Sequence, residues 1–156
     1  MILYHGSTSE IEQIDLSLSK PNKDFGRAFY LSADEDQAFE MAQFKAEIED
    51  AVPVVSAFDF DEEWLSELSV CRFEAYTREW AQFVFDHRND PFGRTLHNYD
   101  IVYGPIANDR IGAQITRLKQ GYIDFEEFVR RIQYAKGITF QYAFCTPRAI
   151  DKLRKL

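Results

Sequence analysis

Short blocks of apolar and polar residues follow one another along the chain, and each block predicts one strand or one helix. Runs of apolar or β-branched residues predict strands at 2–6, 29–31, 53–60, 70–73, 99–105 and 138–144. Apolar residues at helical spacing predict a long helix from Asp34 to about Glu49. Shorter helices or helical turns are expected at 62–69, 78–88, 108–118, 125–134 and 148–156. Because strands and helices mix without regular β-α-β alternation, we expect an α+β fold rather than a doubly wound sheet.

Several predicted helices begin at residues suited to capping. Ser32 precedes the long helix, and Glu35 three residues later completes a capping box. Thr77 and Asp124 stand at the predicted starts of two further helices, where a side-chain oxygen can accept from a free backbone N–H group. These residues predict where three helices begin.

The composition is that of an ordinary globular domain. The 156 residues suit one domain, 1–156, and a hydrophobic fraction of 46% with 15% aromatic residues is ample for a core. A net charge of −8 disfavours broad nucleic-acid binding, because phosphate backbones repel an acidic chain. Two cysteines make no disulfide framework, and no apolar run approaches the ~20 residues that span a bilayer. Since no basic segment precedes the apolar residues after Met1, we expect a soluble cytoplasmic protein with no membrane partner.

Several familiar chemical sites are missing from the sequence. The chain has no P-loop, and no glycine-rich dinucleotide fingerprint follows a strand. The three histidines, His5, His87 and His97, lack the close Cys, His or carboxylate spacing of a metal site. We therefore expect that no metal is needed.

Two short segments carry the candidate chemistry. His5 ends a predicted strand and is followed by Gly6, so a side-chain donor for a sugar hydroxyl would lie beside an open backbone. Gly26 precedes the strand that carries Tyr30, and an aromatic residue there offers a flat surface to a planar heterocycle. Each segment also has a plain structural interpretation, with His5 as an ordinary strand-end residue and Tyr30 as part of the core.

Taken together and in this order, the two segments resemble motifs of the ADP-ribosyltransferase superfamily, in the His-Tyr-Glu branch that includes diphtheria toxin and the poly(ADP-ribose) polymerases. The first motif is matched by His5-Gly6-Ser7, and the second by Gly26-Arg27-Ala28-Phe29-Tyr30-Leu31-Ser32, in which Ala28 replaces a glycine. Most of the chain looks like a narrower, largely uncharacterised bacterial family of that superfamily. The resemblance implies a split β-core of two facing sheets with peripheral helices.

The resemblance also implies a site for NAD, bound as a substrate. His5 would bind the adenosine-side ribose, the backbone of Gly6 would hold the nicotinamide carboxamide, and Tyr30 would stack on the nicotinamide ring. Ser32 would line the same ribose site. The remaining residues of the two motifs that we assign to NAD binding are Ser7, Gly26 and Phe29.

The third element of the superfamily is a Glu at the start of a late strand, and here Gln141 stands at the corresponding position. A Gln can position a ribose hydroxyl but cannot supply the negative charge that stabilises a cationic sugar. We consider Asp24, Asn108 and Asp109 as polar groups that could assist, with turn or helix capping as their structural alternative. His5, Tyr30 and Gln141 are thus the candidate catalytic residues.

Three functions remain open at this point. The first is NAD-dependent mono-ADP-ribosylation of a macromolecule, or NAD hydrolysis, in a toxin or defence effector paired with a small antitoxin-like protein. The second is a module that binds NAD or an ADP-ribose-like nucleotide without turnover, which the missing Glu would explain. The third is an interaction protein that keeps only the fold, because a fold does not determine a reaction.

Overall fold

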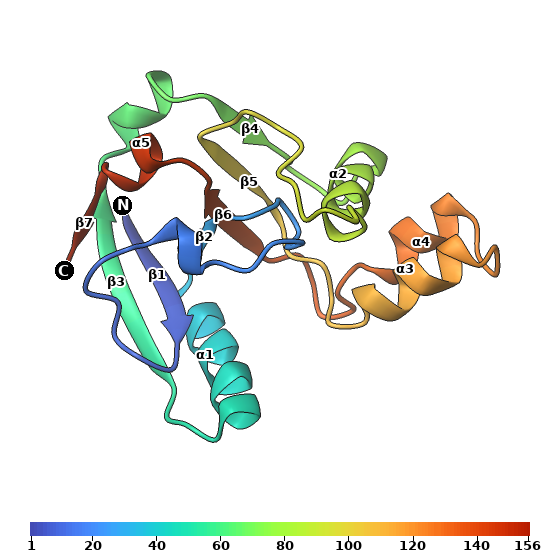
Figure 1. Ribbon diagram of the computed structural model, residues 1–156, viewed down its shortest axis with the longest axis horizontal. Coiled ribbons are helices and arrows are strands. Elements are labelled where there is room, and N and C mark those ends of the chain that lie inside the picture. Colours follow the sequence, from blue (N-terminus) through green and yellow to red (C-terminus); the bar gives the residue numbers. More distant parts are fainter.

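Two β-sheets face each other at the centre of the molecule, as the computed structural model of residues 1–156 shows (Figure 1). The three-stranded sheet has the order β1-β3-β7 and the four-stranded sheet the order β2-β6-β5-β4. Only the β4–β5 pair is parallel. The strands are β1 (Ile2–Ser7), β2 (Phe29–Leu31), β3 (Val54–Phe60), β4 (Val70–Arg72), β5 (Ile101–Pro105), β6 (Phe140–Phe144) and β7 (Leu153–Lys155). The α+β class predicted from the sequence is confirmed.

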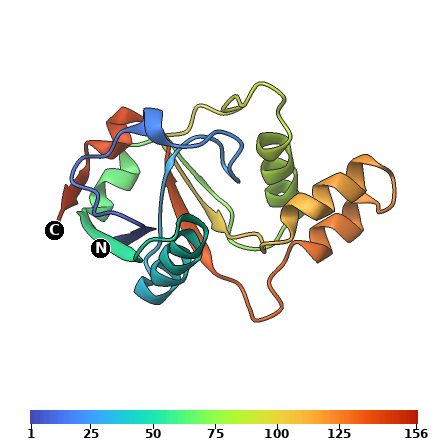
Figure 2. The ribbon, with the colours of Figure 1, turned by 60° about the horizontal axis from the view of Figure 1, so that its bottom comes forward.

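The helices cover different parts of this core. Helix α1 packs against β1 and β3, whereas α3 and α4 form a lobe next to α2 at the opposite end of the molecule (Figures 1 and 2). The helices are α1 (Glu35–Glu49), α2 (Arg78–Arg88), α3 (Ile111–Lys119), α4 (Phe125–Arg131) and α5 (Pro147–Ile150), with 3₁₀ turns η1 (Leu16–Leu18) and η2 (Glu62–Ser66). No helix is both long and apolar enough to cross a membrane.

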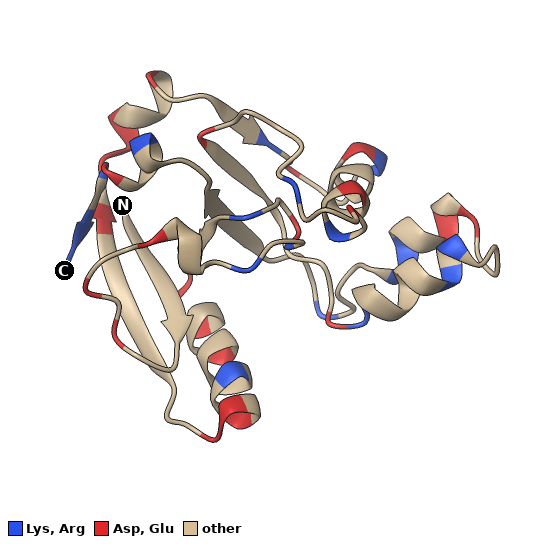
Figure 3. Cartoon of the chain, in the orientation of Figure 1, with Lys and Arg blue, Asp and Glu red and all other residues tan.

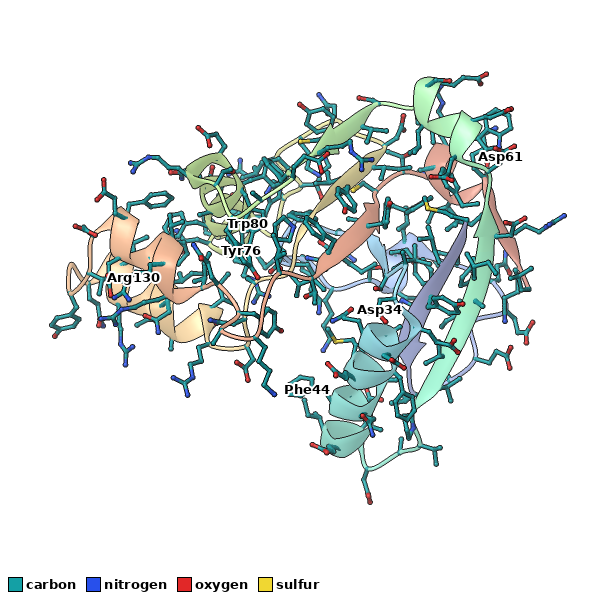
Figure 4. All side chains as sticks on the ribbon, turned by 180° about the vertical axis from the view of Figure 1, so that it is seen from behind. Asp34, Phe44, Asp61, Tyr76, Trp80 and Arg130 are labelled. Atoms are coloured by element: carbon teal, nitrogen blue, oxygen red, sulfur yellow. The ribbon has the colours of Figure 1, made fainter.

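The buried apolar side chains form two cores, one on each face of the four-stranded sheet. Between the sheets, Leu3 and Phe60 of one sheet pack with Phe144 of the other. On the opposite face, Phe25 and Trp80 belong to a cluster with residues of α3 and α4. Figure 4 shows Trp80 next to Tyr76, and the two ring centroids are 5.1 Å apart. Because burying one such side chain contributes about 1.5–3 kcal/mol, both cores are needed to stabilise the fold.

The contact between α1 and β1 explains the first glycine of the candidate motif. A Cβ atom on Gly6 would lie 2.0 Å from the carbonyl oxygen of Ala38 and 2.8 Å from the backbone nitrogen of Ala42. The side of α1 that faces the sheet is built from buried alanines, Ala38, Ala42 and Ala46. Gly6 therefore allows the helix backbone to approach the strand backbone closely.

The two sheets are joined at one backbone bridge. Tyr4 donates to and accepts from Ser32, with N···O distances of 2.7 and 2.8 Å. No further ladder links β1 to β2, so the two strands share this single pairing. The bridge holds the end of β2, just before α1, against the open edge of β1.

Two predictions about local structure are wrong. Helix α1 is capped by Asp34, whose side chain accepts from the N–H groups of Asp36 and Gln37, while Ser32 accepts from the N–H of Asp34. The predicted final helix 148–156 is only the short α5, and the chain then continues into β7. That segment pairs with β3, because an unpaired sheet edge offers more backbone hydrogen bonds than a helix end does.

Candidate functional site

The backbone of Gly6 lies at the open edge of β1. Tyr4 uses its N–H and C=O groups on Ser32, so strand alternation directs the N–H and C=O groups of Gly6 to the same edge. The Gly6 carbonyl accepts from Nζ of Lys45 at 2.8 Å, and this lysine comes from α1. A donor and an acceptor from one residue on an edge of this kind complement a primary carboxamide.

His5 lies next to this edge and is held in one tautomer. Its Nδ1 lies 2.7 Å from the carbonyl oxygen of Tyr30, and because a carbonyl can only accept, Nδ1 carries the proton. The ring stacks on Phe29 with centroids 4.2 Å apart. Burial lowers the pKa of His5 to about 4, and the nearby charge of Lys45 adds to this effect. At neutral pH the free Nε2 is therefore an acceptor, whereas the sequence suggested that His5 would act as a donor.

Tyr30 joins the first motif to the second. Its hydroxyl donates to the carbonyl of Gly26 at 2.7 Å and accepts from the N–H of Phe25 at 2.9 Å. Gly26 has a φ of +89°, a conformation that favours glycine, so the phenol fixes a turn in the chain. Burial raises the pKa of Tyr30 well above its usual value, and the charge of Asp24 raises it further. The Tyr30 hydroxyl is therefore neutral, and both of its hydrogen-bonding roles are used within the turn.

Three polar side chains form what we call the Asp24 cluster: Asp24, Arg88 and Gln141. Nε of Arg88 lies 2.6 Å from Oδ1 of Asp24, and Nε2 of Gln141 donates to Oδ2 at 3.2 Å. Asp24 is only 6% exposed, so these partners offset the cost of burying its charge. Since the amide of Gln141 donates to Asp24, its carbonyl oxygen remains an acceptor. The structure thus brings Gln141 and Asp24 into direct contact.

Basic side chains surround this region, although the protein as a whole is acidic. Desolvation lowers the pKa of Lys23, and the charges of Arg88 and Lys20 lower it further. Desolvation also lowers the pKa of Lys45, and Lys23 contributes to that shift. Figure 3 shows basic segments on the loop before β2, whereas α1 carries mainly acidic ones. This local concentration of cations suits an anionic ligand better than the net charge of the chain suggests.

The other predicted site residues make structural contacts or lie on the surface. The Asn108 amide donates to the carbonyls of Arg131 and Gln133, so it ties the start of α3 to the end of α4, and Asp109 is exposed. Phe29 belongs to the core between the sheets, where it covers His5. Ser7 pairs with Val54 at the end of β1. These residues are not gathered with the Asp24 cluster.

Lys45 and Arg88 are functional candidates that the sequence interpretation did not include. Lys45 follows Ala38 and Ala42 on the face of α1 that meets the sheet, and a lysine in line with buried alanines is the signal that could have identified it. Arg88 ends α2 and gives no such signal, because its partner Asp24 lies 64 residues earlier in the chain. No group of three or more His, Cys, Asp or Glu side chains is placed to hold a metal ion.

Fold and site together define the class of this protein as a two-sheet α+β domain with a polar site beside the junction of the sheets. Residues 1–155 match the model of a sequence family described as "Protein of unknown function (DUF3990)". The chain belongs to this family. Comparisons with curated proteins and with solved structures gave no match. Because the family description states no activity, the resemblance to ADP-ribosyltransferases remains a prediction.

Proposed function

We propose that this protein is an NAD-dependent ADP-ribosyltransferase that transfers single ADP-ribose units to a macromolecule. The observation that carries the proposal is the unpaired backbone edge at Gly6 next to the His5–Tyr30 hydrogen bond, with Gln141 held by Asp24 on the strand that pairs with β2. Such a reaction breaks the nicotinamide–ribose bond, forms a bond from the ribose carbon to the acceptor's nucleophile and releases the proton of that nucleophile.

In this proposal Gly6 and His5 take the roles that the resemblance implies, and two lysines add charge for the phosphates. The N–H and C=O groups of Gly6 would bind the carboxamide, after Lys45 leaves the carbonyl. The unprotonated Nε2 of His5 would accept from a ribose hydroxyl. Lys23 and Lys45 would add positive charge close to the phosphates.

Asp24 offers a solution to the missing Glu. In this proposal the carbonyl oxygen of Gln141 accepts from the ribose 2′-hydroxyl, while the carboxylate of Asp24 orients the amide from behind. The negative charge of Asp24 is then separated from the sugar by the Gln141 side chain, whereas a Glu would contact the sugar directly. Arg88 also partly neutralises the charge of Asp24. We therefore expect slower chemistry than a Glu in direct contact would give.

The decisive experiment measures nicotinamide release and transfer of label from NAD to proteins of a cell lysate. Gln141→Ala should lower turnover by roughly 10²-fold with little change in NAD binding, because orientation acts mainly in the transition state. Gln141→Glu should raise turnover by bringing the charge into contact. Gln43→Ala, an exposed change on α1, is the matched control and should change nothing. Turnover that survives Gln141→Ala unchanged would remove this residue from the mechanism.

A second candidate is a binding module that holds NAD or an ADP-ribose-like nucleotide without cleaving it. The observation that favours it is the double use of the Tyr30 hydroxyl in the Gly26 turn, together with the contact of its ring with Phe25 at 6.4 Å between centroids. A ring held in this way has less freedom to stack on nicotinamide. Saturable NAD binding by calorimetry with no nicotinamide released over hours would favour this module over the transferase.

We also propose a toxin or defence role with a small antitoxin-like protein as partner. Exposed apolar residues on α1 support a protein-binding surface, since Phe44 is 58% and Ile48 70% exposed. In Figure 4, the Phe44 side chain points away from α1 on the side opposite to β1 and β3. Growth arrest on expression, relieved by a co-expressed partner, would test the role, and unaffected growth would contradict it.

A further inference from the structure

A cavity of about 350 Å³ lies on the opposite face of β6 from Gln141. Its size is at the lower end of the range for small-ligand pockets, roughly 300–1,000 Å³. One wall is the start of α1, and the other is aromatic. The lining residues that matter here are Asp34, Gln37, Tyr103, Phe140 and Tyr142, and we call this space the aromatic cavity.

The aromatic wall is a stack of rings from β5 and β6, flanked by an arginine of β4. The rings of Tyr103 and Phe140 are parallel within 4°, with centroids 5.0 Å apart, and Tyr142 lies 4.7 Å from Tyr103. The guanidinium of Arg72 lies 4.4 Å from the centre of the Tyr103 ring. Stacked rings that also line a cavity form a platform for another planar group. All three aromatic residues are only partly buried, so ring surface remains accessible.

The opposite wall provides hydrogen-bond acceptors. Asp34 caps α1 with Oδ1 alone, which leaves Oδ2 free, and the Gln37 amide lies one turn further along. Figure 4 shows Asp34 at the start of α1, next to the strands of the four-stranded sheet. Acceptors of this kind suit the amino group and ring N–H groups of a heterocycle.

Charge excludes one class of ligand. Burial raises the pKa of the Tyr142 phenol; the charge of Arg72 opposes this rise, and the carboxylates of Glu62 and Glu74 add to it. The only basic side chain against the wall, Arg72, is paired with Glu74 at 3.0 Å. A phosphate would therefore meet negative charge and no free cation here.

We propose that the aromatic cavity binds an uncharged, amino-substituted planar heterocycle, a nucleobase presented without phosphate. Tyr30 and Gln141 lie on the other face of the sheet, so the proposal does not use their chemistry. Ser32, which the resemblance assigns to the NAD ribose site, also lines this cavity, so the test variants must distinguish the two sites. Residues 140 and 142 serve the cavity, whereas residue 141, between them, serves the Asp24 cluster.

Adenosine is the probe, and binding is followed by saturation-transfer NMR and calorimetry on the full chain. Phe140→Leu removes the ring but keeps apolar bulk, and we expect it to weaken adenosine binding by about 10-fold. Phe92→Leu, the same change at an exposed aromatic position elsewhere, is the matched control and should leave the affinity unchanged. AMP should bind less tightly than adenosine, because its phosphate meets negative charge. Asp34→Asn keeps a capping side chain but removes one negative charge, so it should reduce the difference in affinity between AMP and adenosine.

Several results would overturn the proposal. Adenosine binding that is lost in His5→Gln and retained in Phe140→Leu would place the ligand in the proposed NAD site, where His5 is the residue that meets the adenosine-side ribose. If all the variants bound adenosine with the same affinity, the aromatic cavity would not be its binding site. If no binding were detected at millimolar adenosine, the cavity would not bind this class of ligand. Tighter binding of a single-stranded oligoadenylate than of adenosine would identify nucleic acid as the source of the base. Nicotinamide release from NAD, measured on the same variants, tests the transferase function separately.

Discussion

The two faces of β6 differ in how their polar and aromatic groups are used. On one face, Gln141 is bound to Asp24, and Tyr30 has its hydroxyl saturated by the Gly26 turn. On the other, Phe140 and Tyr142 line a cavity whose acceptors are partly free. Adjacent residues thus belong to a closed site and an open one, because side chains alternate along a strand. The polar groups of the site predicted by motif are therefore the ones already used in internal hydrogen bonds.

The largest effect is expected from a change that displaces α1, which lines the aromatic cavity and carries Lys45. Gly6→Ala would force the helix backbone away from β1, since its Cβ would lie 2.0 Å from the Ala38 oxygen. We expect a loss of about 3 kcal/mol in the free energy of unfolding, measured by urea denaturation. Gly112→Ala in α3, where no atom lies within 4 Å, is the matched control and should be neutral or slightly stabilising. Equal stabilities for the two variants would show that α1 does not need Gly6.

Acid should destabilise the protein through its buried histidines. His5 has a folded pKa of about 4 against 6.5 when unfolded, so the unfolded chain binds more protons between these values. Stability is therefore fully present above pH 6.5 and falls as the pH drops towards 4, by about 3 kcal/mol for His5 alone. Burial also lowers the pKa of His87 and of His97. The like charge of His87 lowers the pKa of His97 further, whereas Asp86 and Asp90 oppose the lowering of the His87 pKa.

The measurement is urea denaturation at several pH values from 7.5 to 4.5, compared with the variant His5→Gln. The low pKa values of Asp90 and Glu127, both about 2, place the loss of these ion pairs below this window. We expect the unfolding free energy of His5→Gln to depend less steeply on pH than that of the native chain. This result would show that protonation of His5 destabilises the native fold. Stability independent of pH in both proteins would contradict the buried neutral histidine.

Removing the charge at the centre of the Asp24 cluster should have an intermediate effect. Asp24→Ala leaves Arg88 and the Gln141 amide without their partner, and we expect a loss of about 2 kcal/mol. Asp109→Ala removes an exposed carboxylate and should change stability by less than about 0.5 kcal/mol. Adenosine binding at the aromatic cavity should persist in folded Asp24→Ala, and its loss would show that the two faces are coupled.

The smallest change in stability is expected for Lys45→Met, which keeps most of the side-chain bulk and removes the donor to Gly6. The unfolding free energy should change by less than about 1 kcal/mol. The pKa of His5 should rise, because Lys45 contributes to lowering it, and an NMR titration would detect this. Nicotinamide should bind more tightly once the Gly6 carbonyl is free, whereas Lys119→Met on α3 should have no effect. Unchanged nicotinamide binding would mean that Lys45 does not block this edge.

Local sequence signals determined much of the secondary structure. The strand Phe29–Leu31 and the helix Arg78–Arg88 with its Thr77 cap lie where they were predicted, because their signals come from residues within a few positions. The Ser32 cap prediction is wrong by two residues, since Asp34 offers an equally good capping side chain closer to the helix. Strand β7 was missed because its formation depends on the free edge of β3, which is distant in the sequence.

By itself the sequence determined the α+β class, the start of most helices and the motif residues His5, Gly6, Tyr30 and Gln141. Only the tertiary structure decided what these residues contact. It placed Asp24 between Gln141 and Arg88, put Lys45 on the Gly6 carbonyl and opened the aromatic cavity behind β6. The physical reason is range: caps and periodicity act over a few residues, whereas Gln141 meets Asp24 across 117 positions only after both sheets have formed.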